Sequence, residues 1–139
     1  MLNVVVAALQ GDATLGTLLT GGVYDQLVVG EISRQKTPAA FDAFKELKPC
    51  ALVMGESSTP WGPMHDSGRV YFLVWLYQQH GAQTIESART RVYKLLHRKQ
   101  LSTTAGIYEI RHANDVLGIE VQGLNAQGIQ SRFVATVQR

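Results

Sequence analysis

The hydrophobic pattern changes its period in the middle of the chain. Residues 68–77 are mostly β-branched and aromatic, and both alternating sets of side chains are apolar, which is typical of a strand covered on both faces. From Ile85 to Leu96 the apolar residues recur at helical spacing, and Thr84 is the expected N-cap. Basic residues follow near the negative end of the helix dipole. The pattern predicts a central strand followed by an amphipathic helix that packs back on the sheet.

The N-terminal part predicts shorter elements. One helix is expected to end at Gly11, and Asp12 is placed to cap a second helix through Leu19, which the glycine pair 21–22 ends. Residues 23–25 are expected to form a short extended piece. These helices present apolar stripes that can join the same core.

Residues 26–49 have no clear period. Within them, residues 38–47 are expected to form a short helix with Pro38 in its first turn. We therefore expect this segment to run as a long excursion outside the sheet.

Further strands are expected on both sides of the helix. Residues 50–56 read as a buried strand that forms a hairpin with residues 68–77, and the turn-rich residues 57–67 are expected to form its long tip. Residues 107–121 and 129–137 predict two or three more strands around a turn. The prediction is a single α+β domain over residues 1–139, with a mostly antiparallel sheet of four to five strands. Its helices lie on one side, and segments 26–49 and 57–67 project from it.

Composition narrows the class of protein. The 139 residues are 45% hydrophobic and only 17% charged, which argues against long disorder, and a net charge of +2 is too weak to indicate nucleic-acid binding. Cys50 stands alone, so neither an internal disulfide nor a cysteine-based metal cage is expected. No apolar run reaches the roughly 20 residues that span a bilayer, so no membrane partner is expected. Residues 1–9 lack the basic residues of a signal peptide, and we expect the protein to assemble where it is made.

The sequence offers no convincing catalytic constellation. The four histidines (His65, His80, His97 and His112) are not spaced as metal ligands, and no nucleophile elbow, phosphate-binding loop or dinucleotide fingerprint is present. His97, at the end of the predicted helix, is expected to be a partner of the helix dipole. We therefore predict no catalytic, cofactor or metal site, and no enzyme.

Two features remain as candidates for contact with other molecules. The predicted helix carries the basic residues Arg89, Arg91, Lys94 and Arg98, of which the last three share one side. They form either a solvated outer face or a cationic surface toward a polyanion or an acidic protein. Trp61, in a loop rich in proline and glycine, either folds back on the core or lies at a subunit contact.

The order of these motifs resembles the tail-completion and tail-terminator proteins of tailed bacteriophages. The resemblance covers most of the chain, and its soft motifs are an N-terminal helix, the break at residues 21–24, the amphipathic helix and an amphipathic last strand. The hairpin carries the stretches Ala51-Leu52-Val53-Met54-Gly55-Glu56, Thr59-Pro60-Trp61 and Gly68-Arg69-Val70.

The resemblance implies a structural virion protein in the neck or tail, assembled in the host cytoplasm. Such proteins form rings, commonly hexamers, that cap the tail tube and meet the connector or head-completion protein, while genomic DNA passes through the lumen. On this basis Trp61, Met64, Phe41 and Phe44 are candidate contacts with neighbouring subunits or the tube. The basic residues at positions 89, 91, 94 and 98 are candidates to face the DNA.

Three alternatives stay open. The chain could be another neck or head-completion ring protein. It could be a small ligand-binding or catalytic α+β domain, with a pocket near Tyr71, Trp75 and Tyr77. It could also be a basic protein that binds nucleic acid with steep salt dependence.

Overall fold

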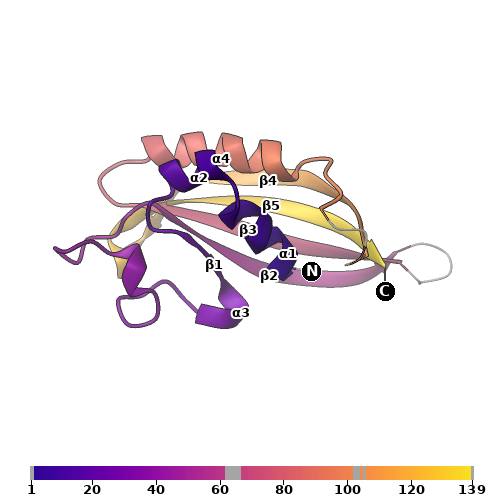
Figure 1. The fold of residues 1–139 in the computed structure, drawn as a ribbon, viewed down its shortest axis with the longest axis horizontal. Helices are drawn as coiled ribbons and strands as arrows, with labels where there is room; N and C mark the ends of the chain where they lie inside the picture. Colours follow the sequence, from indigo (N-terminus) through magenta and orange to yellow (C-terminus); the bar gives the residue numbers. More distant parts are fainter. Residues whose placement is uncertain (1, 62–66, 102–103, 105, 139) are drawn as a thin grey trace.

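The sheet has five strands in the order β1-β2-β3-β5-β4. A computed structural model describes residues 2–61, 67–101, 104 and 106–138 of the chain (Figure 1). The strands are β1 (Val23–Asp25), β2 (Cys50–Trp61), β3 (Ser67–Gln78), β4 (Ile107–Val121) and β5 (Ala126–Gln138). β1 runs parallel to β2, and every other pair is antiparallel. The predicted α+β class with a mostly antiparallel sheet is confirmed.

Three helices cover one face of the sheet (Figure 1). They are α1 (Leu2–Gln10), α2 (Ala13–Leu18) and α4 (Gln83–Leu96). The apolar stripe of α4 is fully buried at Ile85, Ala88, Val92 and Leu96, as its spacing predicts. Beneath it, the rings of Phe72 and Phe133 stack at 5.6 Å between centroids. β3 and α4, the strand and helix predicted as the nucleus of the fold, therefore pack on each other in the main core.

The opposite face of the sheet has a smaller core of its own. Residues 26–49 contain α3 (Gln26–Val29) and η1 (Pro38–Ala40), and they return below the sheet in Figure 1. Their buried side chains pack against β2 and β3 in one cluster of Ile32, Ala40, Leu47, Cys50, Leu52, Tyr77 and Ala126. The excursion predicted to lie outside the sheet therefore covers part of its second face. This cover explains why both alternating sets of β3 are apolar.

The hairpin is more regular than the sequence suggests. Residues 57–61 continue β2 and pair with residues 67–71 of β3, so most of the expected loop is strand. A register shift between Gly55 and Ser57 accommodates the extra residue. Met64, His65 and Asp66 lie outside the described residues, as does the side chain of Trp61.

Two helix predictions were wrong in detail. α4 begins after Ala82 rather than Thr84, and the Gln78 side chain accepts a hydrogen bond from the backbone N–H of Ile85 in its first turn. The helix expected over residues 38–47 is only the single turn η1, after which Phe41 and Leu47 pair as an antiparallel bridge. The carboxylate of Asp42 closes the turn between these two bridged residues, because it accepts from the backbone N–H groups of Phe44 and Glu46.

β4 is one long strand, although the sequence also allowed two strands within residues 107–121. It runs along the edge of the sheet. Its register shifts three times against β5, between residues 107 and 109, 112 and 114, and 116 and 119.

None of the helices in the described ranges combines the length and the apolar character that a membrane span requires.

Candidate assembly surfaces

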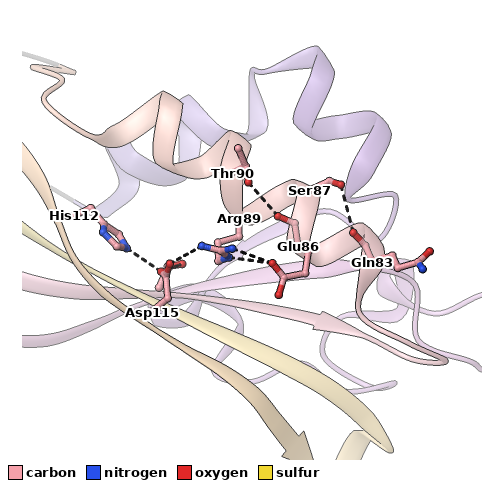
Figure 2. A network of polar contacts seen from close by, with 8 residues as sticks. Gln83, Glu86, Ser87, Arg89, Thr90, His112 and Asp115 are labelled. Atoms are coloured by element: carbon pink, nitrogen blue, oxygen red, sulfur yellow. Dashed lines mark hydrogen bonds and ion pairs between the residues drawn. The ribbon is translucent and has the colours of Figure 1, made fainter.

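Arg89, one of the four basic candidates, lies in an internal ion-pair network (Figure 2). Its guanidinium donates to Glu86 Oε2 at 2.9 Å, one turn earlier on α4, and to Asp115 Oδ2 at 2.8 Å on β4. Asp115 Oδ1 also accepts from the Ser131 hydroxyl at 2.7 Å and lies 2.8 Å from His112 Nε2. The network joins α4 to the last two strands, so Arg89 is held inside the fold.

Hydrogen bonds within the network favour the charged forms of Asp115 and Arg89. Burial raises the pKa of Asp115, but hydrogen bonds from His112, Ser131 and Arg89 outweigh it and hold the pKa below its usual value. The hydrogen bond to Glu86 is the main cause that raises the pKa of Arg89. Because its charge is balanced by two carboxylates, Arg89 contributes little to a cationic surface.

Arg91 forms the second clamp. Its Nη2 lies 2.7 Å from Asp12 Oδ1 and its Nε 2.9 Å from Asp12 Oδ2. Asp12 is also the N-cap of α2, as predicted, and accepts from the backbone N–H of Leu15 at 2.8 Å. The hydrogen bonds from Arg91 and Leu15 lower the pKa of Asp12 to about 2. The pair therefore fastens α2 to α4.

The remaining two basic candidates, Lys94 and Arg98, are both exposed, but they lie at different places in the fold. Lys94 lies in the last turn of α4 and is exposed. Arg98 has a left-handed backbone (φ 60°), and its N–H donates to the carbonyl of Ile110 at 2.6 Å, beside the outer edge of β4. The four residues therefore do not form one patch. The partners Glu86 and Asp12 lie on helices that the sequence predicts, but Asp115, 26 residues from Arg89, gives no local signal.

His97, the expected dipole partner, lies beside β4. Its Nδ1 accepts from the backbone N–H of His112 at 3.0 Å, and its ring stacks on Tyr93 at 4.6 Å. Burial and the nearby Arg98 lower the pKa of His97, which favours the neutral ring. The sequence predicted a partner of the helix dipole, and His97 does lie at the C-cap of α4, where its ring also contacts Tyr93 and the backbone of β4.

The predicted contact residues fall into different environments. Phe44 is 85% exposed at the turn that follows η1. Phe41 is half-buried in the smaller core, and the guanidinium of Arg34 lies 5.1 Å above its ring. The backbone of Trp61 ends β2 opposite Ser67. Of the predicted contacts whose side chains are described, Phe44 alone is free to meet another molecule.

A depression of about 550 Å³ lies between residues 30–35 and the second face of the sheet. Tyr77 lines it, whereas Trp75 stacks on Tyr77 at 6.0 Å and Tyr71 lies under the guanidinium of Arg132 at 4.6 Å. The aromatic residues predicted to share a pocket are therefore spread along the strand. Within the described ranges, no group of three or more His, Cys, Asp or Glu side chains could hold a metal ion.

Comparisons with known proteins show the fold. No family model matches the chain, and no curated protein matches it. Among solved structures, a chain of the "Virion of native gene transfer agent (GTA) particle" superposes with a TM-score of 0.71 and 16% sequence identity. The match covers 97% of this chain and 92% of that chain. The two chains share one fold along nearly their whole lengths.

Proposed function

We propose that this chain is a structural protein of a phage-like particle, and that it forms a ring at the head-proximal end of the tail tube. The observation that carries the proposal is the shared fold with a component of a gene transfer agent virion, which extends over 97% of the chain. The resemblance of its sequence motifs to tail terminators supports the finer role. In that role the ring, commonly a hexamer, caps the tube and meets the connector, and no reaction is catalysed.

The exposed turn at Phe44 is the proposed contact with the tube, together with the hairpin tip that includes Trp61 and Met64. Phe44 is 85% exposed, and its turn is held by Asp42 and by Arg34, which donates to the carbonyl of Lys45 at 2.8 Å. A rigid turn with an exposed aromatic side chain is suited to a protein contact, because little entropy is lost on binding. Phe41 supports this turn from the smaller core.

Lys94 is the proposed contact with DNA in the lumen, because the charges of Arg89 and Arg91 are compensated inside the fold. One such lysine per subunit, repeated around a ring, would contact phosphates without sequence readout. Exchanging Lys94 for Glu should slow DNA passage or lower DNA retention in assembled particles. The same exchange at Lys36, which is exposed in segment 26–49, should change neither DNA passage nor DNA retention.

The decisive experiment combines the purified chain with tubes of its tail-tube protein. Electron microscopy should show rings, and the rings should sit at one end of each tube. The variant Phe44→Ala should reduce the fraction of capped tubes, while Gln35→Ala, an exchange at another exposed position of the same segment, should not. Tubes that stay uncapped in the presence of the wild-type chain would contradict the terminator role.

The depression beside Tyr77 favours a second candidate, a small-ligand binding domain. A bound ligand stabilises the native state by mass action, so a thermal-shift screen separates the two functions. A compound that raises the melting temperature of the wild-type chain, but not of a Tyr77→Ala variant, would support the second candidate.

A further inference from the structure

Most of the exposed large apolar side chains in the described part of the chain lie at opposite edges of the sheet. Among the described residues, the large hydrophobic side chains that remain exposed are Leu27, Val28, Phe44, Tyr93, Tyr108, Val116 and Leu117. Leu27 and Val28 belong to α3, which directly follows edge strand β1. Tyr108, Val116 and Leu117 belong to β4, at the other edge. We call these the α3 edge and the β4 edge.

The bulges of β4 account for the apolar side chains on its edge. The register shifts leave Tyr108 and Leu117 without a partner on β5, and they are 49% and 54% exposed. Gly118 has a φ of 67°, which lets the strand turn at the third register shift, between Val116 and Ile119. Bulges re-aim side chains and interrupt the ladder, so they discourage another strand from pairing with the edge. The β4 edge is therefore suited to a partner that docks with side chains.

The α3 edge presents such side chains on a single rigid turn. The Asp25 carboxylate accepts from the backbone N–H of Leu27 at 3.0 Å and caps the turn. Gly30, with a φ of 78°, closes its other end, where its N–H donates to the carbonyl of Gln26 at 2.8 Å. Leu27 is 77% exposed and Val28 80% exposed. Both caps hold two neighbouring apolar side chains toward solvent.

Charge favours contact between the two edges. The α3 edge carries Asp25 and the exposed Glu31. The exposed Arg98 and Lys99 lie beside one end of the β4 edge, because their backbone is fixed against Ile110, and Arg111 is exposed there too. The exposed Glu120 lies near the other end. Opposite charges around an apolar centre resemble the usual anatomy of a protein interface.

We infer that the α3 edge of one copy docks on the β4 edge of the next copy. The inference rests on the proposed function, since it names the contact that builds the ring. The two patches differ and lie on opposite sides of the sheet, so each subunit offers one of each. Such a head-to-tail contact propagates from copy to copy and closes into a ring when its rotation allows. Leu27 and Val28 pack on the bulged surface at Val116 and Leu117, and the acidic side of the α3 edge lies toward the basic end of the β4 edge.

The test uses two variants that each destroy one edge. The first carries Leu27→Asp and Val28→Asp, and the second carries Val116→Asp and Leu117→Asp. All four positions are exposed or lie at bulges, so folding should survive, and circular dichroism checks it. Each variant alone should sediment as a monomer, whereas the wild type forms rings. A control with Ser87→Asp and Thr90→Asp, exposed on α4, should still form rings.

An equimolar mixture of the two variants provides the sharper result. The first retains its β4 edge and the second its α3 edge, so the mixture should give dimers and nothing larger. A cysteine at position 28 of one chain should also form a disulfide with a cysteine at position 117 of another. Neither cysteine variant should crosslink to itself, and buried Cys50 does not interfere.

The outcomes separate this inference from the proposed function. If both aspartate variants still form rings, the assigned edges are wrong and the ring function stands. If the edges behave as inferred but the rings never cap tail tubes, the contact stands and the terminator role is wrong. If the wild type is monomeric and the cysteine pair gives no crosslink at high protein concentration, the inferred contact is overturned.

Discussion

Replacing Asp115 with Ala should destabilise the fold through the network that joins α4 to the last strands. The change removes a carboxylate that is 15% exposed, and three side chains, those of Arg89, His112 and Ser131, lose it as a hydrogen-bond partner. Ser131 is 1% exposed, so its hydroxyl would be left buried and unsatisfied, at a cost of about 1–3 kcal/mol. Arg89 is 30% exposed and keeps Glu86, so losing its second partner adds at most about 1 kcal/mol.

The expected total is a loss of about 1–4 kcal/mol in the free energy of unfolding. For 139 residues, an unfolding entropy of about 2.1 cal/mol/K per residue converts this loss to a drop of about 3–14 °C in melting temperature. Thermal unfolding followed by circular dichroism at pH 7 measures the drop, at one protein concentration because association shifts the transition. Asn114→Ala, next to Asp115 and exposed, is the matched control and should change little.

The double variant with Ser131→Ala tests the mechanism rather than the magnitude. Removing the hydroxyl as well removes the buried group that was left unsatisfied, so the double variant should lose less stability than the sum of the two single changes. Strict additivity, or a single Asp115→Ala variant within about 0.5 kcal/mol of the wild type, would refute the reasoning.

Three further predictions test the cores and the second clamp. Phe133→Ala should lower the free energy of unfolding by about 3–5 kcal/mol in urea titrations, because the 1% exposed ring leaves a cavity against its stacking partner. Asp12 has a folded pKa of about 2 against an ordinary 3.8, so its stabilisation is complete above about pH 4 and is lost as the pH falls toward 2. Arg91→Met should flatten that acid limb of the stability curve, and an unchanged limb would show that the pair does not cause it. Burial raises the pKa of the Cys50 thiol to about 12, so a thiol reagent at pH 8 should modify it only on unfolding, and rapid labelling of the native chain would contradict its placement in the smaller core.

The sequence predicted the main core well, because two distinct patterns meet there. The β-branched and aromatic content of residues 68–77 favours a strand, and the helical stripe from Ile85 to Leu96 favours a helix. The short strand β1 has three residues, too few to show a period. Its parallel pairing with β2 depends on contacts that form only in the folded chain.

Pro60 explains why residues 57–61 were predicted as loop although they continue strand β2. Proline, glycine and serine between residues 55 and 62 are typical of a loop, because proline cannot donate to a strand ladder. In the structure β1 pairs only with residues 51–53 of β2, so the rest of β2 is an edge strand on that side. An edge strand tolerates a missing N–H when that position faces outward. The sequence could not show where β1 would stop.

The candidate surfaces were predictable only in part, for a related reason. A basic stripe on a helix looks the same whether or not an acid from another element meets it, and Asp115 meets Arg89 from 26 residues away. Exposure of Phe44 depends on how the turn at Asp42 closes. The apolar β4 edge depends on bulges, and a one-residue shift in pairing is not encoded in the alternation of a single strand.

The network at Asp115 also links stability to assembly. Asp115 immediately precedes Val116, the residue at which the register of β4 shifts toward Leu117. Its carboxylate pins this point of the strand to α4 through Arg89 and to β5 through Ser131. We expect this fixed charge to hold the strand where the bulge begins, and a bulge re-aims the side chains beside it. An Asp115→Asn variant can still accept the Ser131 hydrogen bond but loses the pairing with Arg89. It should weaken self-association more than its modest loss of stability accounts for, and sedimentation below the unfolding temperature measures the difference. Equal self-association of this variant and the wild type would show that the bulge holds its shape without the charge.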